Sequence, residues 1–222
     1  MFRLEHYQSI PSTQELMKQK IRADEDVDRL IIRADEQSKG LGRQGRSFVS
    51  KAGGSYQTIA FKDRNNQLQK PYSAILFAIS LARQFKMKGL SVKIKWPNDL
   101  YYMDKKLGGI LAEYIKKHLV VGIGINAQND LPTNAIGLKL ELSRINRIVE
   151  ISSLEAMSLF ESNIDLAKLY KPYDYLLDKT IVIKKPNETI TAQAKGISQL
   201  GCLILQDDRQ IELCSGHIVD IF

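Results

Sequence analysis

The chain has 222 residues, of which 44% are hydrophobic and 26% are charged, a composition typical of a folded globular protein and not of a disordered one. Its formal net charge of +7, from 32 Lys and Arg against 25 Asp and Glu, favours polyanions or an acidic protein as partners. The longest apolar run, 72–81, contains Ser73 and Ser80 and is too short and polar to span a bilayer. The segment 1–10 lacks the apolar core of a secretory signal, so we expect a cytoplasmic protein without membrane contact.

Hydrophobic periodicity predicts short strands and a few helices over most of the chain. Ser12 and Glu15 have the spacing of a capping box and predict a helix that begins at this point. Further helices are predicted over 72–85 and 153–170. The strands predicted in this part, in chain order, are 3–7, 29–34, 56–61, 92–96, 100–102, 107–114 and 119–125. This pattern predicts an α+β fold with a mixed β-sheet flanked by helices.

The pattern changes after Pro172, where short strands follow one another without helices between them. The strands predicted here are 180–183, 189–197, 202–206, 210–213 and 218–221. Turn signals separate them at Pro186-Asn187, Leu200-Gly201 and Asp207-Asp208. Such a series is typical of a small closed β-barrel. We place the boundary near Leu177, which divides the chain into domains 1–176 and 177–222.

The cysteines and histidines carry little chemical signal. Cys202 and Cys214 are too few for a disulfide framework of the secreted type, and both lie in apolar stretches, so we interpret them as small buried side chains. The three histidines are scattered without zinc-ligand spacing, and no G-x-S-x-G motif occurs. The sequence therefore predicts neither a zinc centre nor a serine nucleophile of this kind.

The loop 40–46 carries the first chemical signal. It matches the dinucleotide pattern G-x-G-x-x-G, but a helix should follow that pattern at once, and Ser47-Phe48 does not begin one, so we reject this interpretation. Glycines still let backbone N–H groups approach an anion, and Arg43 and Arg46 add planar donors suited to phosphate or carboxylate. The loop is predicted to be a mobile anion clamp, with nucleic-acid contact as the alternative on charge alone.

A second group of residues is 95–99, with the sequence Lys-Trp-Pro-Asn-Asp, followed by 105–113. Lys106 stands where a strand begins, beside two glycines that let a ligand approach closely. A lysine so placed suits the charge that develops in a phosphoryl or acyl-phosphate transition state, although simple solvation at the surface is the plainer alternative. A third group, 122–126, is a strand that ends in an amide and is weak by itself.

These groups, together with Ser12-Thr13-Gln14 and Asp35-Glu36-Gln37, resemble the biotin–protein ligases, also called biotin–[acetyl-CoA-carboxylase] ligases, in order and separation. The resemblance covers essentially the whole chain. It implies a catalytic fold like that of class II synthetases, followed by a small C-terminal SH3-like β-barrel. It also implies a two-step reaction. Biotin and ATP, usually with Mg²⁺, give biotinyl-5′-AMP, and a lysine of a biotin carboxyl carrier protein, a subunit of acetyl-CoA carboxylase, then takes the biotin.

The resemblance also implies roles for individual residues. Those expected to contact biotin are Ser12, Thr13, Gln14, Gln37, Gly40, Leu41, Gly42, Arg43, Lys106 and Gly109. Those expected to contact ATP are Arg43, Arg46, Phe48, Asn98, Asp99, Lys106 and Asn126. Lys106 and Arg43 are the expected catalytic pair, the first neutralising developing charge and the second retaining the adenylate. Leu41 and Phe48 depart from the family, in which arginine and tryptophan are common at these places.

Several alternatives accompany this interpretation. Some family members carry an N-terminal helix-turn-helix domain that represses biotin-synthesis genes. The strand 3–7 leaves no room for it, so we expect a ligase that does not bind DNA. A lipoate ligase or octanoyl transferase of the same fold is the closest alternative. RNA binding through the C-terminal barrel is the rival from another class, although 178–222 lacks a cluster of aromatics for base stacking. Relatives often pair through exposed sheet edges, which raises a homodimer as an oligomeric state.

Overall fold

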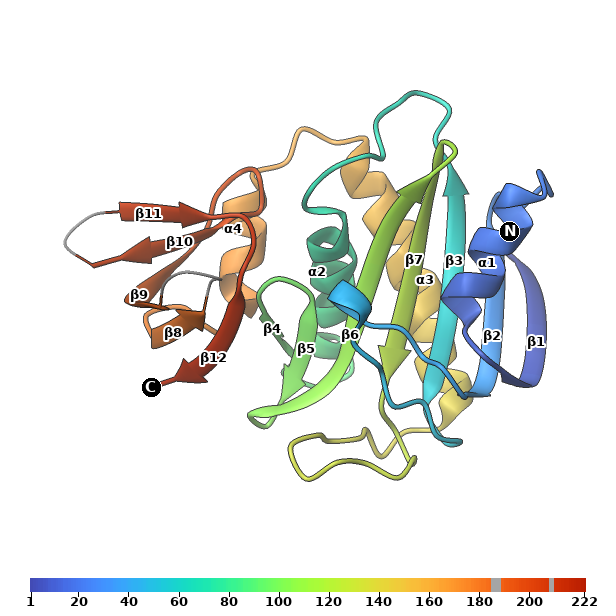
Figure 1. Ribbon diagram of the computed structural model, residues 1–222, viewed down its shortest axis with the longest axis horizontal. Helices are drawn as coiled ribbons and strands as arrows, with labels where there is room; N and C mark the ends of the chain where they lie inside the picture. The colour runs from blue at the N-terminus through green and yellow to red at the C-terminus, as the bar shows by residue number, and fades with distance from the viewer. Residues whose placement is uncertain (185–188, 208–209) are drawn as a thin grey trace.

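The computed structural model describes residues 1–184, 189–207 and 210–222, and its strands form two sheets (Figure 1). The first sheet has the order β1-β2-β3-β7-β6-β5-β4, in which β1 and β2 are parallel and all other neighbours are antiparallel. Its strands are β1 (Arg3–Ile10), β2 (Leu30–Gln37), β3 (Ser55–Lys62), β4 (Lys93–Lys95), β5 (Asp99–Tyr102), β6 (Lys105–Ile115) and β7 (His118–Ile125). The predicted mixed α+β sheet is confirmed.

Helices cover the two faces of this sheet unequally. The helices are α1 (Thr13–Arg22), α2 (Ser73–Lys86), α3 (Leu142–Phe160) and α4 (Leu166–Tyr170), with 3-10 turns η1 (Arg43–Gly45) and η2 (Lys171–Tyr173). Figure 1 shows α2 and α3 behind the sheet, where they close the main hydrophobic core. On the other face α1 buries Met17 and Ile21 against Ile32, Ala60 and Val120. None of the described helices is long and apolar enough to cross a membrane.

Local sequence explains where the first helix and the central hairpins begin and end. The Ser12 hydroxyl accepts a hydrogen bond from the Glu15 N–H at 3.3 Å, so the predicted cap is confirmed. Lys116 and Lys117 both have positive φ, as a two-residue hairpin between β6 and β7 requires. Met103 and Asp104, which form the turn between β5 and β6, likewise both have positive φ.

The helix predicted over 153–170 is wrong at its start and in its continuity. The structure has two helices, and α3 begins at Leu142, eleven residues earlier. Ile145 and Val149 extend the buried stripe toward the N-terminus, which is why the helix is longer. The break before α4 is set by Asp165, whose carboxylate accepts from the Lys168 N–H at 3.0 Å and caps a new helix.

The second sheet is antiparallel, with the order β11-β10-β9-β8-β12. Its strands are β8 (Thr180–Lys184), β9 (Thr189–Ile197), β10 (Leu203–Gln206), β11 (Gln210–Leu213) and β12 (His217–Ile221). The predicted all-β C-terminal unit is therefore confirmed, although over the described residues β11 and β12 are edge strands that do not pair to close it. The predicted turn at Pro186-Asn187 and the residue Asp208 of another lie outside the described residues.

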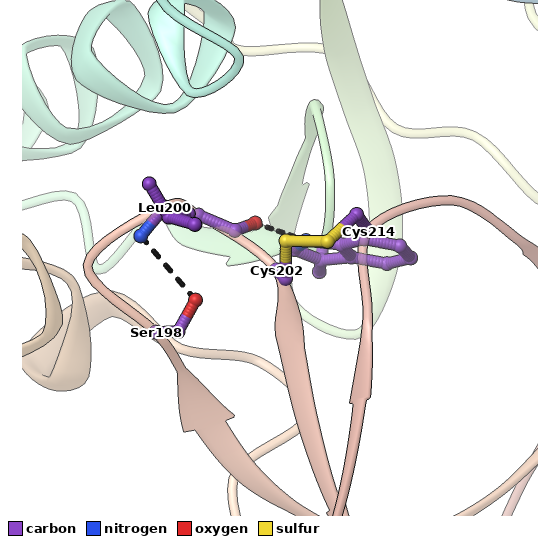
Figure 2. Close-up of a disulfide and its surroundings, with 6 residues drawn as sticks. Ser198, Leu200, Cys202 and Cys214 are labelled. Carbon is purple, nitrogen blue, oxygen red and sulfur yellow. Dashed lines mark hydrogen bonds between the residues drawn. A yellow bond between two sulfur atoms is a disulfide. The ribbon is translucent and has the colours of Figure 1, made fainter.

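Cys202 and Cys214 form a disulfide, so the prediction of two separate buried thiols is wrong (Figure 2). The register of the second sheet explains the error. Leu203 pairs with Leu213, and this places the two flanking cysteines opposite each other. Their Cα atoms lie 4.1 Å apart. Figure 2 shows the disulfide beside the turn in which the Leu200 N–H donates to the Ser198 hydroxyl at 3.3 Å.

The two sheets are joined through β4 and the chain that follows it. The indole N–H of Trp96, which is only 3% exposed, donates to the Gly201 carbonyl at 2.9 Å. The Ile94 carbonyl accepts from the Tyr170 hydroxyl at 3.0 Å and from the Tyr175 N–H at 2.9 Å. Asp174 pairs with Ile94 in an isolated bridge. This junction fixes the second sheet beside the β4–β5 end of the first.

Asp174 gives the junction a predictable dependence on pH. The residue is 7% exposed, and burial raises the pKa of its carboxyl to about 6 although backbone N–H groups donate to it. Because the folded pKa lies above the unfolded value, ionisation opposes folding, and the free energy of unfolding falls between about pH 4 and pH 6. The expected penalty above that window is about 3 kcal/mol.

We therefore expect Asp174→Asn to gain stability relative to the wild type as pH rises. Urea unfolding at pH 4 and pH 8 should show a relative change of about 3 kcal/mol in favour of the variant at the higher pH. Asp26→Asn, at a side chain that is 78% exposed, is the control and should show no such trend. A difference between wild type and Asp174→Asn that is independent of pH would contradict the assignment.

Candidate active site

The floor of the candidate site consists of glycines that two paired strands, β6 and β7, bring together. Residues paired across β3, β7, β6 and β5 point to the same face, and alternate residues along a strand do the same. The first row holds Asp99, Gly109, Gly124 and Tyr56; the second holds Leu111, Gly122 and Thr58; the third holds Glu113, Val120 and Ala60. The helix α1 covers the third row, so the glycines of the first two rows leave space that side chains would fill.

A cavity of about 190 Å³ lies over these glycines. Residues that the sequence predicted and that line it are Ser12, Thr13, Gln14, Gln37, Leu41, Gly42, Arg43, Arg46, Phe48, Asn98, Asp99, Lys106 and Gly109. The rest of the lining includes Tyr56, Gln57, Thr58, Lys95, Gly122, Gly124, Gly216 and Ile218. The last two come from the second sheet, which therefore contributes to the wall of the cavity.

The end of the cavity beside α1 is uncharged and densely hydrogen-bonded. We call it the closed end, and it consists of Thr13, Gln14, Gln37, Thr58 and Gly122. The Gln37 side-chain oxygen accepts from the Thr13 N–H at 2.8 Å and from its hydroxyl at 3.0 Å. The Thr58 hydroxyl donates to the Thr13 hydroxyl at 2.8 Å. These contacts hold several donors and acceptors in fixed directions, as recognition of a polar ring requires.

The other end, on the β5–β6 side of the sheet, is cationic. This cationic end consists of Arg43, Lys95, Asp99 and Lys106. The Lys106 ammonium lies 2.8 Å from an Asp99 carboxylate oxygen. Burial lowers the pKa of Lys95. The negative charge of Asp99 raises this pKa, and the positive charge of Lys106 lowers it further. Burial also lowers the pKa of Arg43, against Asp99, although a guanidinium stays charged at neutral pH. Three cations against one carboxylate suit an anionic ligand.

The loop 40–46 folds over the cavity as a small hairpin and not as the start of a helix. The Gly42 N–H donates to the Arg46 carbonyl at 2.7 Å, and the Phe48 N–H donates to the Gly40 carbonyl at 2.8 Å. Only the 3-10 turn η1 interrupts it, and the next α-helix is α2, so rejection of the dinucleotide pattern is confirmed. In Figure 1 η1 lies in front of β6, opposite α2 and α3.

Two predicted site residues do not line the cavity. Gly40 is buried behind the hairpin, where a Cβ would lie 2.3 Å from the Phe48 carbonyl oxygen. Asn126 is 5% exposed, and its amide lies 3.4 Å from the Lys106 carbonyl. Its predicted contact with ATP stays a prediction, and in this structure it supports the backbone that carries Lys106.

Sequence reasoning missed part of the site. Gly122 and Gly124 alternate along β7, which is a signal that both belong to one face, but their value as a floor depends on Gly109 of the paired strand. Lys95 has no signal of its own in the sequence beyond its place in the group 95–99. Nothing in the sequence links Gly216 and Ile218 to the cavity, because the packing of the two sheets brings them there.

Comparison with known proteins agrees with this geometry. The model of the biotin/lipoate A/B protein ligase family matches residues 7–130, which is more than half of the chain and includes the sheet, the loop and both ends of the cavity. The chain belongs to this family. As a member of the biotin/lipoate A/B protein ligase family, it has the sequence relatives and the structural neighbours that the family leads one to expect.

The sequence relatives resemble this chain at low sequence identity. The bifunctional ligase/repressor BirA of Salmonella typhimurium is 26% identical over 208 residues, which cover 85% of this chain and 65% of BirA. The biotin–[acetyl-CoA-carboxylase] ligase of Mycobacterium tuberculosis is 24% identical over 217 residues, covering 88% and 80%. The structure of the Aquifex aeolicus biotin protein ligase in complex with biotin and ATP superposes with a TM-score of 0.83 at 22% identity, covering 100% and 99% of the two chains. It supports the fold.

The close contact between Gly124 and the Phe48 ring predicts how an added methyl group changes stability. A Cβ at position 124 would lie 2.6 Å from the Phe48 ring, so Gly124→Ala should displace that ring and lower the free energy of unfolding by about 1–3 kcal/mol. In a Phe48→Ala background the same change should have little effect, because the ring is gone. Urea unfolding of the four proteins measures this coupling. An equal loss in both backgrounds would show that the strand, and not the ring, resists the methyl group.

Proposed function

We propose that this protein is an ATP-dependent biotin–protein ligase. One observation carries the proposal. A single cavity has an uncharged, hydrogen-bonding closed end over β3 and β7 and a cationic end on the β5–β6 side. This arrangement suits a molecule with a polar ring at one end and a carboxylate at the other, beside an anionic second substrate. Biotin and ATP have these properties, and the family of the chain handles biotin or lipoate.

The closed end favours biotin over lipoate. Biotin has a ureido ring with both donors and an acceptor, whereas the dithiolane ring of lipoate forms no comparable hydrogen bonds. A dithiolane at the closed end would leave the polar groups of Thr13, Gln14 and Gln37 without ligand partners. Sites built to hydrogen-bond a ring reject analogues that lack those groups, often by several orders of magnitude. We therefore assign Ser12, Thr13, Gln14 and Gln37 to the ring.

In the proposed first step, a carboxylate oxygen of biotin attacks the α-phosphorus of ATP. The bond from phosphorus to the oxygen that bridges to the β-phosphate breaks, and pyrophosphate leaves with its charge. Lys106 neutralises negative charge that develops between the two reactants, and Asp99 holds its ammonium in place at 2.8 Å. Arg43 retains the adenylate, with Leu41, Gly42 and Gly109 beside the chain of biotin.

The proposed ATP contacts follow the same division. Arg46 binds phosphate oxygens, and Phe48, which lies over Gly109 and Gly124, offers its ring to the adenine. The carboxylate of Asp99 fits the Mg²⁺ that accompanies ATP, because Mg²⁺ is commonly held by one or two carboxylates together with substrate phosphates. Asn98 lies beside it, and its amide donates to the Ile110 carbonyl at 2.9 Å. When bound, Mg²⁺ supplies positive charge to the phosphates.

In the proposed second step, a lysine amine of a biotin carboxyl carrier protein attacks the acyl carbon of the adenylate. The amide bond forms, the bond from the acyl carbon to the phosphate oxygen breaks, and AMP leaves, while the amine nitrogen loses one proton and keeps the other. The net charge of +7 suits an acidic carrier domain. We also propose a domain boundary at 176/177. The second domain, 177–222, lines part of the cavity, and we propose that the carrier enters beside it.

The proposed function predicts a specific first product. Purified protein with ATP and biotin should release pyrophosphate and form biotinyl-5′-AMP, detected by mass spectrometry, and addition of a carrier domain should transfer the biotin to one lysine. Lipoate in place of biotin is the control and should give no adenylate. Formation of lipoyl-adenylate without a biotin product would refute the proposal and favour the lipoate alternative.

Replacement of Lys106 tests the charge at the reacting centre. Lys106→Ala should lower the single-turnover rate of adenylate formation by roughly 10²–10³-fold while the fold stays intact, because a preorganised cation is lost. Lys105→Ala is the matched control at an exposed neighbour outside the cavity and should retain nearly full rate. A near-normal rate for Lys106→Ala would mean that this residue does not act on the reaction.

Replacement of Arg43 tests retention of the intermediate. Arg43→Gly should release the adenylate at least about tenfold faster, since a charge-assisted hydrogen bond is lost, and should label lysines of bystander proteins. Lys39→Gly changes an exposed cation of the same segment and serves as control. Quantitative proteomics of biotinylated lysines reads this out. Labelling that stays confined to the carrier would contradict the role of Arg43.

A further inference from the structure

Glu113 stands beside the closed end of the cavity without lining it. It occupies the third row of the sheet, next to the row of Gly122 and Leu111, and its side chain is 37% exposed. One of its carboxylate oxygens accepts a hydrogen bond from the Gln14 side-chain amide at 2.8 Å, across a separation of 99 residues. Gln14 itself is 3% exposed and lines the cavity.

A carboxylate only accepts hydrogen bonds, so it decides which way a neighbouring amide points. The NH₂ group of Gln14 faces Glu113, and the amide oxygen must therefore face the other way. That oxygen lies over Gly122, where a Cβ would come within 2.6 Å of it. The opposite orientation would place the Gln14 oxygen against the Glu113 oxygens and the NH₂ group over the floor of the cavity.

Lys18 forms an ion pair with Glu113 on the side away from the cavity floor. Its ammonium lies 3.2 Å from the Glu113 carboxylate and 3.1 Å from that of Glu15, and its side chain is 14% exposed. Burial opposes the charge on Lys18, but the hydrogen bonds with Glu15 and Glu113 outweigh it and raise its pKa. Lys18 also limits the directions that the Glu113 carboxylate adopts.

The Gln14 oxygen keeps acceptor capacity for a ligand. Thr58 lies 3.3 Å from it, but the hydroxyl of Thr58 has one proton, and that proton has a shorter acceptor in Thr13 at 2.8 Å. The oxygen therefore faces the closed end as an acceptor whose protein partner is weak. A ligand ring that places an N–H group there satisfies it.

We propose that Glu113, held by Lys18, is a positioning residue that orients the Gln14 carboxamide so that its oxygen faces the closed end and selects a ring carrying an N–H group. The inference rests on the proposed function, since the ureido ring of biotin supplies such groups. It adds to that function a determinant of ring specificity that lies outside the cavity.

A double-mutant cycle tests the inference with the full chain. Isothermal titration of biotin in the absence of ATP should show about fivefold weaker binding for Glu113→Gln, which removes the charge and lets the Gln14 amide point either way. Gln14→Ala should also weaken binding, and Glu113→Gln should have no further effect in the Gln14→Ala background. Glu15→Gln is the matched control, because it removes the other carboxylate on Lys18 without touching Gln14, and should bind like the wild type.

The kinetic pattern gives a second readout. In Glu113→Gln the KM for biotin should rise about fivefold while kcat of adenylate formation changes less than about twofold, because the reacting carboxylate lies at the other end of the cavity. Wild-type affinity in Glu113→Gln, or an equal loss in the presence and absence of Gln14, would overturn the inference. Should Glu113→Gln fail to fold, Glu113→Asp replaces it in the cycle, since the shorter side chain keeps the charge and loses the reach. A wild type that binds no biotin would instead refute the proposed function.

Discussion

The antiparallel pairing of β6 with β7 is the constraint on which the rest of the site depends. It aligns Gly109 with Gly124 and brings Gly122 into the next row on the same face. Side chains at these places would occupy the space that the cavity takes, and the contacts already formed by Phe48 and Gln14 show how little room is left. Because the floor is backbone, strand register sets its shape, and no rotamer change is needed to open it.

Each wall of the cavity above this floor comes from a different part of the chain. The helix α1 covers the third row of the floor, and its N-terminus lies over the second row. Its first residues therefore bring hydrogen-bonding groups to the closed end. The β4–β5 connection and the start of β6 bring the charged groups to the other end. The hairpin that carries Arg43 covers both. A ring-binding region and a charge-binding region therefore arise from different parts of the chain.

Much of this was predictable from local sequence. The capping residues Ser12 and Glu15, the strands of the first sheet and the lysine at the start of β6 all have signals that lie within a few residues. The motif residues that line the cavity were predicted from resemblance. The start of α3 differs from the prediction, because the buried stripe continues toward the N-terminus through Ile145. The disulfide has no local signal, because it depends on the register of β10 and β11. The contact between Gln14 and Glu113 spans 99 residues, and tertiary packing alone creates it.

The bond from Trp96 to the Gly201 carbonyl has a consequence for how the two ends of the cavity are held. The closed end belongs to one mechanical unit, the first sheet with α1. The cationic end is linked to the second sheet, because Lys95 and Asp99 flank Trp96, and Gly216 and Ile218 of the C-terminal unit also line the cavity. The packing of the second sheet therefore bears on where the charged groups stand, whereas the hydrogen-bonding groups of the closed end come from the first sheet and α1.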